Sequence, residues 1–277
     1  MPENKKEQVL SVRDLDITFK TTAGKVHAIR GVNIDLYKGE TVALVGESGS
    51  GKSVFTKTFV GMLDVNGKIT GGSILYEGRD MTKFTEKDWL GVRGKKIAMV
   101  MQDPMTSLNP VFRIGQQVDE VTMLHNPEMS KEEVKARTLE MLDLVGIANK
   151  EGVYSMYPHE LSGGMRQRIM IAIALACSPT LIIADEPTTA LDVTIQAQIL
   201  DLLQNLKDKL NSSIMLITHD LGVVAGMADY VVVMYAGRVV EKGTADEIFH
   251  HPGHPYTIGL MKSKPVVGKK VDALYNI

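Results

Sequence analysis

The stretch Gly46-Glu47-Ser48-Gly49-Ser50-Gly51-Lys52-Ser53 follows the apolar run of residues 41–45 and precedes the apolar residues 54–63. This order predicts a buried strand, a glycine-rich loop and then a helix. Glycines let the backbone N–H groups of such a loop curl around phosphates, and the start of the helix adds positive potential. Lys52 is expected to neutralise the β- and γ-phosphates of a nucleotide, and the Ser53 hydroxyl to bind Mg²⁺. A glycine-rich turn that only joins a strand to a helix would not need these two side chains.

A second apolar run, residues 181–184, ends in the two acids Asp185 and Glu186, and Pro187 then breaks the chain. Carboxylates at the tip of a buried strand, beside a phosphate loop, are suited to hold a metal and an attacking water. We expect Asp185 to hold Mg²⁺, through water, and Glu186 to polarise the nucleophile. The plainer interpretation, a strand that ends in an acidic turn, carries less weight beside a phosphate loop.

Strands and helices alternate along the chain, which predicts an α/β fold. Two further apolar runs, residues 96–101 and 214–218, have the composition of parallel strands covered on both faces. Segments that alternate more openly predict antiparallel strands at residues 10–19 and 28–36, with a short strand at 74–76. Residues 230–234 and 238–241 predict a hairpin around Ala236-Gly237.

Residues 104–178 have a helical pattern and predict an insertion between two core strands. Ser130 and Glu133 form the sequence of a capping box, and Gly146 supplies a stop. Between them, apolar and small residues fall on one helical face: Val134, Thr138, Met141, Leu142 and Val145.

The composition narrows the class of protein. The 277 residues are 44% hydrophobic with a formal net charge of −2, which gives no general reason to expect nucleic acid binding. The single cysteine, Cys177, excludes an internal disulfide and a cysteine-rich metal site, and it fits a reducing cytosol. The longest apolar run, residues 169–177, is far shorter than the roughly 20 residues that cross a bilayer. We therefore expect any membrane role to come through a partner.

A further motif, Leu161-Ser162-Gly163-Gly164-Met165-Arg166-Gln167-Arg168, is followed by an apolar helical pattern to residue 176. By itself, Ser-Gly-Gly could be a helix-opening turn. Beside the phosphate loop and the paired acids, the motif resembles the signature of ATP-binding cassette ATPases, and the likeness covers nearly the whole chain. The resemblance implies that Ser162, Gly163 and Gly164 place a helix N-terminus against the γ-phosphate bound on an opposite subunit.

The resemblance also implies roles for residues elsewhere. Gln102 matches the glutamine that contacts the γ-phosphate and the metal, and His219 matches the switch histidine. Ala190-Leu191-Asp192 matches the loop that crosses a dimer interface. Phe19 lies where an aromatic ring stacks on adenine. Glu186 and His219 are both present in this chain, so we expect it to be catalytically active.

The fold that the resemblance implies is a P-loop ATPase core with a mixed sheet, an N-terminal antiparallel β subdomain and an inserted α-helical subdomain. The expected domains are 1–103 and 179–250 for the ATPase core with the β subdomain, 104–178 for the helical signature subdomain, and 251–277 for a C-terminal extension. Each motif occurs once in the chain, and the resemblance implies a head-to-tail dimer that holds two ATP molecules with Mg²⁺ at its interface.

Several details resemble the ATPase subunits of oligopeptide and dipeptide importers. They are the composition of the phosphate loop, the run Gln102-Asp103-Pro104-Met105-Thr106-Ser107-Leu108-Asn109-Pro110, and the tail Gly253-His254-Pro255-Tyr256-Thr257. Such importers combine two different ATPase subunits, two membrane permease subunits and an extracytoplasmic solute-binding protein. The expected location is peripheral, on the cytoplasmic face of the cell membrane. The tail motif has a plainer interpretation as a rigid turn before a helix at residues 257–261.

The chain differs from the importer subfamily in one respect. Many members carry a cysteine-rich tail that resembles an iron–sulfur site. With only Cys177, no iron–sulfur cluster is expected in this chain. The alternatives are an importer of nickel or another small solute, an exporter, or a cassette ATPase of DNA repair, chromosome maintenance or translation. A simple P-loop kinase or GTPase would not need residues 161–165.

Overall fold

The computed structural model describes residues 6–189 and 191–263. They form two compact units: Met1–Phe84 with Met215–Ile277, and Thr85–Ile214. The unit boundaries differ from the predicted domain boundaries because the strands at residues 97–100 and 181–185 group with the helices that follow them. The predicted division into an ATPase core, a helical subdomain and a C-terminal extension was based on motifs and resemblance, and it stays a prediction.

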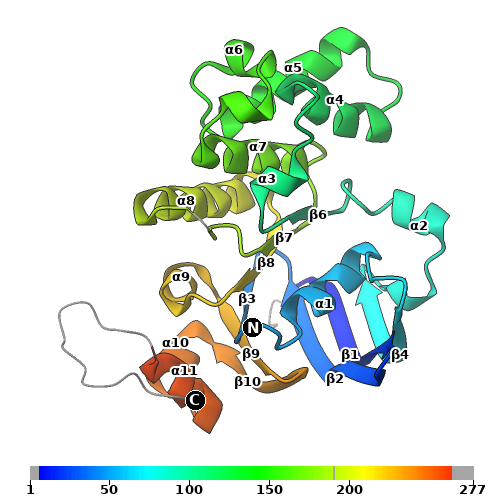
Figure 1. Ribbon diagram of the computed structural model, residues 1–277, viewed down its shortest axis with the longest axis vertical. Helices are drawn as coiled ribbons and strands as arrows, with labels where there is room; N and C mark the ends of the chain where they lie inside the picture. The colour runs from blue at the N-terminus through cyan, green and yellow to red at the C-terminus, as the bar shows by residue number, and fades with distance from the viewer. Residues whose placement is uncertain (1–5, 190, 264–277) are drawn as a thin grey trace, which may run out of the picture. The chain divides into compact units, whose positions relative to one another are not determined.

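The first unit contains a four-stranded antiparallel sheet in the order β2-β1-β4-β5 (Figure 1). Its strands are β1 (Gln8–Thr21), β2 (Gly24–Tyr37), β4 (Gly67–Tyr76) and β5 (Arg79–Asp80). Apolar buried residues recur along β1 at Leu10 and Val12 and, after a shift of register, at Leu15 and Ile17. The predicted antiparallel strands are thus confirmed, and each extends beyond the predicted range.

The same unit holds one side of a six-stranded sheet, in the order β10-β9-β3-β8. These strands are β3 (Thr41–Val45), β8 (Ser213–Thr218), β9 (Tyr230–Tyr235) and β10 (Arg238–Thr244). β3 pairs parallel with β9, and β9 turns back antiparallel into β10. Ala236 and Gly237 have φ values of 46° and 79°, as a tight hairpin turn requires. The predicted hairpin is confirmed.

Three helices lie in the C-terminal part of the first unit: α9 (Leu221–Met227) between β8 and β9, and α10 (Ala245–His250) and α11 (Pro255–Lys262) after β10. Their apolar side chains pack against β3 and β9 in one cluster that includes Val45, Val233 and Tyr256. The predicted helix at residues 257–261 is therefore present and begins two residues earlier, since proline fits the first turn of a helix.

In the second unit, β6 (Ile97–Val100) pairs parallel with β7 (Leu181–Asp185). The boundary between the units falls within β8, between Ile214 and Met215. The helices of this unit are α2 (Glu86–Leu90), α3 (Pro104–Ser107), α4 (Ile114–His125), α5 (Lys131–Leu144), α6 (Lys150–Tyr154), α7 (Gly163–Leu175) and α8 (Val193–Leu210). The predicted helical character of residues 104–178 is confirmed.

The helix after the phosphate loop differs from the prediction of residues 54–63. It begins earlier, as α1 (Lys52–Lys57), and tightens into a 3₁₀ turn at Thr58–Val60. Gly61 then takes φ 61°, a left-handed conformation that ends the helix. The apolar residues beyond Gly61 belong to a loop, which apolar content alone does not distinguish from a helix.

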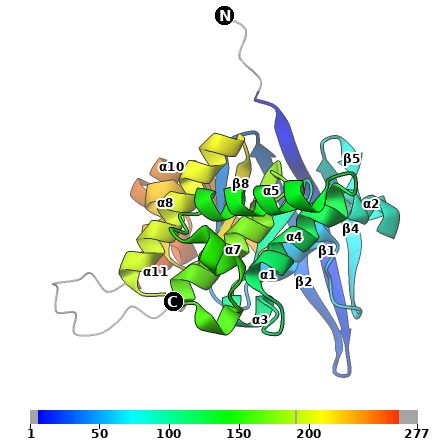
Figure 2. The same ribbon diagram turned by 90° about the horizontal axis from the view of Figure 1, so that it is seen from above.

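Helices α4, α5 and α7 pack against one another in the second unit (Figure 2). α5 begins at the predicted capping box, where the side chains of Ser130 and Glu133 each bind the other's backbone, and it ends before Gly146. Asp119 of α4 accepts hydrogen bonds from Thr138 of α5 and Tyr154 of α6, both at 2.5 Å. One carboxylate thereby joins three helices.

Replacing Asp119 with Ala is expected to destabilise the protein by about 1–3 kcal/mol, because the hydroxyl of the fully buried Thr138 loses its acceptor.

The stability contributed by Tyr154 should depend on pH. Burial is the main cause that raises the pKa of the Tyr154 hydroxyl to about 12, and its hydrogen bond to Asp119 is the second cause. The stability that Tyr154 contributes is therefore full below its ordinary pKa of about 10 and is lost as the pH rises toward 12. Urea unfolding at pH 8 and pH 11 measures both effects, with Glu120→Ala as the control for an exposed carboxylate on α4.

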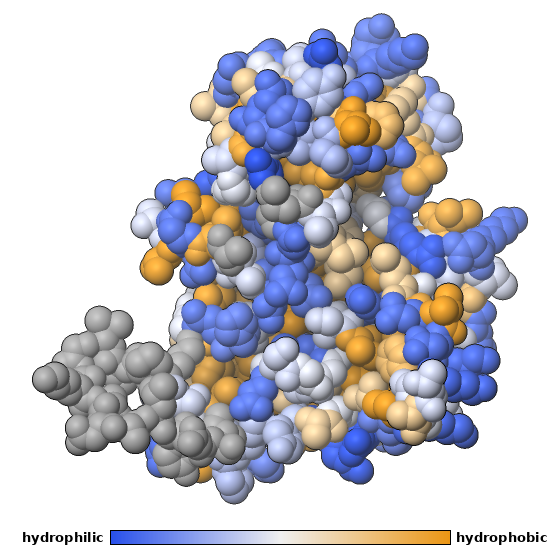
Figure 3. Space-filling view, viewed as in Figure 1, coloured by the Kyte–Doolittle hydropathy of each residue, from blue (hydrophilic) through white to orange (hydrophobic). Residues whose placement is uncertain are grey.

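Among the described residues, none of the helices combines the length and the apolar character that crossing a membrane requires. The second unit does expose large apolar side chains, including Leu90, Val111, Phe112 and Leu124. The hydropathy surface shows hydrophobic residues at several separate places among hydrophilic ones (Figure 3).

Candidate nucleotide-binding site

The phosphate loop follows β3, whose five residues are all buried. Lys52 is the first residue of α1, and its side chain is 5% exposed. Its Nζ donates to the carbonyl oxygens of Gly46 at 2.7 Å and Glu47 at 2.8 Å, and to Ser50 Oγ at 3.4 Å. The loop is therefore wrapped around the ammonium group, and the phosphate-binding role of Lys52 stays a prediction.

Two glycines of the loop have a packing role as well as a conformational one. Gly46 has φ 151°, and a Cβ there would lie 2.2 Å from the carbonyl oxygen of Met234 in β9. Gly51 has φ 105°, and a Cβ there would lie 2.8 Å from Ile29 Cδ1 in β2. A side chain at either position would thus push the loop away from the strands behind it.

The loop is also held from behind by two hydrogen bonds. The backbone N–H of Gly237, in the β9–β10 turn, donates to the carbonyl oxygen of Ser50 at 2.9 Å. The backbone N–H of Glu47 donates to the hydroxyl of Tyr256, in α11, at 3.0 Å. Sequence reasoning found the loop but missed the contact of Tyr256 with it, because it interpreted the tail motif around Tyr256 as a likeness to peptide importers or as a turn. The contact could not be predicted, because residues 47 and 256 are far apart in the sequence and no local pattern connects them.

In the second unit, Asp185 ends β7 and is 7% exposed. Glu186 follows with φ 47°, a left-handed conformation that costs a non-glycine residue about 1–3 kcal/mol. Its Oε2 accepts hydrogen bonds from Gln102 Nε2 and Thr189 Oγ1, both at 2.9 Å. The structure therefore brings two predicted site residues, Gln102 and Glu186, into direct contact. The role of Thr189 was not foreseen, although its spacing of three residues from Glu186 fits a turn.

The signature residues begin a helix, as predicted. Ser162 caps α7, and its Oγ accepts from the backbone N–H of Met165 at 3.3 Å. Asp192 similarly caps α8 through the N–H of Ile195 at 3.0 Å. A Cβ on Gly164 would lie 2.9 Å from Ile195 Cγ2, so the starts of α7 and α8 are close neighbours. Ala190 lies outside the described residues.

The remaining predicted residues lie in the first unit. His219 follows β8 and is exposed. Phe19 is half-buried in β1, and its ring covers the backbone of Gly67, where a Cβ would lie 2.6 Å from Phe19 Cε1. The Phe19 ring therefore packs closely against Gly67 within the sheet. Their predicted roles at the γ-phosphate and at adenine stay predictions.

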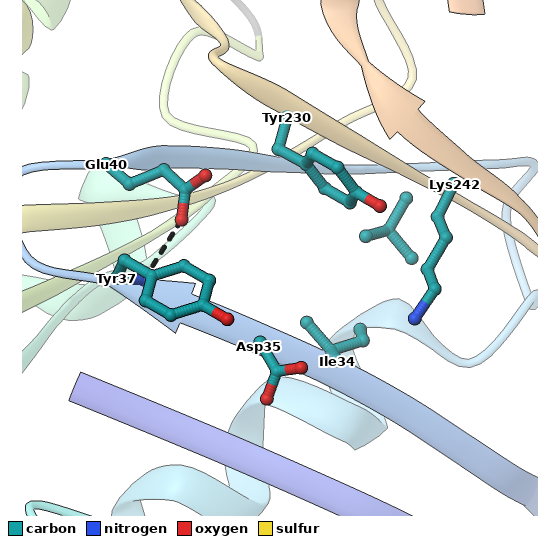
Figure 4. A pocket seen from close by; sticks show the side chains of 7 residues that line it. Ile34, Asp35, Tyr37, Glu40, Tyr230 and Lys242 are labelled. Carbon is teal, nitrogen blue, oxygen red and sulfur yellow. Dashed lines mark hydrogen bonds between the residues drawn. The ribbon is translucent and has the colours of Figure 1, made fainter. Parts of the chain in front are cut away.

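The first unit also contains a cavity of about 270 Å³, which is lined by none of the phosphate-loop residues (Figure 4). Its polar lining includes Asp35, Glu40, Tyr230 and Lys242. Burial raises the pKa of the Glu40 carboxyl, while the N–H of Tyr37 donates to it at 3.0 Å. With two carboxyl groups and one ammonium, the cavity is poorly matched to a triphosphate.

Together, the strand-loop-helix around Lys52 and the strand tip at Asp185 and Glu186 define a P-loop nucleotide-binding protein. Residues 29–189 match the ABC transporter family, and residues 240–277 match the C-terminal region of oligopeptide/dipeptide transporters. The chain is 55% identical over 271 residues to the dipeptide transport ATP-binding protein DppD of Lactococcus lactis subsp. cremoris, covering 98% of this chain and 78% of that protein. It is 56% identical over 261 residues to the oligopeptide transport ATP-binding protein OppD of Bacillus subtilis, covering 94% and 73%.

Solved structures give the same class. The ATP-binding cassette MJ0796, in a dimeric post-hydrolysis state bound to ADP and Pi, has a TM-score of 0.76 at 28% identity, covering 85% of this chain and 98% of that one. CbiO1 of Clostridium perfringens has a TM-score of 0.77 at 30% identity, covering 89% and 92%. The chain therefore belongs to the ABC transporter family, in its group of oligopeptide and dipeptide transport ATP-binding proteins. The predicted cassette resemblance and the predicted α/β fold are both confirmed, and membership of this ATPase family means that the chain binds and hydrolyses ATP.

Proposed function

We propose that this chain is the ATP-hydrolysing subunit that powers an importer of oligopeptides or dipeptides across the cytoplasmic membrane. The observation that carries this proposal is the identity of more than half of the residues with relatives named for peptide transport, over nearly the whole chain. The match of residues 240–277 to the C-terminal region of such transporters supports it independently of the cassette motifs.

The phosphates of ATP would be bound by the loop Gly46, Glu47, Ser48, Gly49, Ser50 and Gly51, together with Lys52 and Ser53. Backbone N–H groups of the loop would be the donors, except that of Glu47, which donates to the Tyr256 hydroxyl. Burial of Lys52 favours this role, because a buried ammonium group interacts more strongly with phosphate than an exposed one. Phe19 would stack on adenine. Each of these assignments is part of the proposal.

The donors proposed for Mg²⁺ are the Ser53 hydroxyl, the Asp185 carboxylate and the Gln102 amide oxygen. They fit the ion, because Mg²⁺ prefers oxygen ligands and a carboxylate among them. When bound, Mg²⁺ supplies charge neutralisation at the β- and γ-phosphate oxygens. The Gln102 amide nitrogen already donates to Glu186 at 2.9 Å, which leaves its oxygen for a ligand.

Glu186 would orient and polarise the attacking water, and His219 would contact the γ-phosphate. Two donors hold the Glu186 carboxylate in place, so it need not reorganise as the reaction proceeds. This preorganisation offsets the strain of its left-handed backbone.

The signature would act on a nucleotide bound by another subunit. Ser162 and Gly163 are exposed and Gly164 is half-buried at the start of α7, a suitable donor group for phosphate, and Asp192 lies at the neighbouring helix start. We propose a head-to-tail heterodimer with a second ATPase subunit, and the dimer described for MJ0796 supports such pairing.

Two membrane permease subunits and an extracytoplasmic solute-binding protein would complete the importer, with this chain at the cytoplasmic face. The exposed apolar residues of the second unit are available for such contacts.

The experiment is to measure ATP hydrolysis by the purified chain in liposomes, with and without the neighbouring candidate ATPase and membrane subunits. Activity should rise on assembly, and rise again when a peptide-loaded binding protein is added. An empty binding protein is the matched control. Strong hydrolysis that ignores both the membrane subunits and the peptide would contradict the transport role.

A further inference from the structure

The hydroxyl of Tyr256 reaches the phosphate loop from a distant part of the chain. Tyr256 is the second residue of α11 and is 6% exposed. Its hydroxyl oxygen accepts the backbone N–H of Glu47 at 3.0 Å. The motif around Tyr256 has no part in the mechanism proposed above.

The peptide unit between Gly46 and Glu47 is held at both of its polar ends. Its carbonyl oxygen, on Gly46, accepts from Lys52 Nζ at 2.7 Å. Its N–H, on Glu47, donates to Tyr256. Because the atoms of a peptide unit lie in one plane, fixing the direction of the N–H also fixes the direction of the carbonyl group. The Tyr256 hydroxyl therefore determines how Gly46 presents its oxygen to the Lys52 ammonium.

Tyr256 is itself held firmly, so it can serve as a fixed point. Its backbone N–H donates to His254 Nδ1 at 3.1 Å. The N–H groups of Gly253 and His254 donate to the Glu241 carboxylate at 2.6 and 3.2 Å. The Tyr256 ring packs against Tyr235 with centroids 4.6 Å apart. The segment is thus anchored to the β9–β10 hairpin.

We propose that Tyr256 is a positioning residue for ATP binding, whose hydroxyl holds the Gly46–Glu47 peptide, and through it Lys52, in the orientation that accepts phosphates. This inference rests on the proposed function only in taking the loop as the ATP site. Burial raises the pKa of Tyr256, which keeps the hydroxyl neutral and fit to accept at physiological pH. Since Tyr256 acts on the loop and not on Glu186, it should govern affinity and leave the chemical step unchanged.

The test is Tyr256→Phe, which keeps the ring in place and removes only the oxygen. Without its acceptor, the Glu47 N–H faces a ring edge, and the loop spends less time in the binding conformation. The Kd of ATP and the KM for ATP should both rise by about 3- to 10-fold, with kcat unchanged. Tyr230→Phe is the matched control, because it lies at the start of β9, away from Met234 at the loop. It should leave all three constants unchanged.

An unchanged Kd and KM in Tyr256→Phe, or a fall in kcat alone, would overturn the inference. Failure of the proposed function has a different signature, because the wild-type chain itself would then fail to bind ATP. If Tyr256→Phe lowers the overall fold stability, hydrogen exchange of the Glu47 amide in the wild-type protein decides the matter. Slow exchange supports the inference, and exchange as fast as in an open loop contradicts it.

Discussion

Glu186→Gln should hydrolyse ATP about 10²- to 10⁴-fold more slowly than the wild-type chain while binding ATP equally well. That factor is the usual contribution of a general base, which an amide cannot replace. Glutamine has the same shape, and its amide oxygen can still accept from Gln102 and Thr189, as the Glu186 carboxylate does. The loss should therefore lie in the chemical step. Single-turnover hydrolysis and equilibrium ATP binding measure the two quantities separately.

Asp201→Asn is the matched control for Glu186→Gln, because it also replaces one carboxylate by its amide, on the exposed side of α8 in the same unit. Its hydrolysis rate should equal that of the wild-type chain. If Glu186→Gln also hydrolysed ATP at the wild-type rate, Glu186 would not be the base.

Lys52→Ala should weaken ATP binding by roughly 10- to 100-fold, the effect of losing a charged hydrogen-bond donor worth about 1.5–3 kcal/mol. The loss has two causes. The ammonium can no longer interact with phosphate, and the loop loses the donor that its own oxygens surround at Gly46 and Glu47. Equilibrium binding of ATP measures the sum.

The control for Lys52→Ala is Lys57→Ala, which removes the same charge from the last turn of α1. It should change ATP affinity little, since a single partly exposed charge has a small effect. Equal affinities for Lys52→Ala and the wild-type chain would remove the phosphate-binding role of the loop.

Local sequence patterns predicted the fold where the physical cause is itself local. The apolar run before Gly46 became β3, the capping box at Ser130 began α5, and the Ala236-Gly237 turn joined β9 to β10. The helix after Lys52 was predicted too long because apolar residues continue past Gly61, whose left-handed backbone stops it.

Contacts between distant residues could not be predicted in this way. The glycines of the loop were expected to serve the phosphates, yet Gly46 also has to clear Met234 of β9. The acidic strand tip predicted Glu186 as a site residue and the resemblance predicted Gln102, but the hydrogen bond between them depends on how β6 and β7 pair. Tyr256 lies 209 residues from Glu47, and only the fold brings its hydroxyl to the loop.

The most direct test of the account is ATP-dependent uptake of a labelled peptide into vesicles. The vesicles hold this chain, the candidate second ATPase, the two membrane subunits and the binding protein. We expect peptide to accumulate with ATP and the wild-type chain, and to stay at background with Glu186→Gln. Accumulation that is the same with Glu186→Gln, or ATP hydrolysis by the wild-type assembly without any accumulation, would contradict a role in powering peptide import.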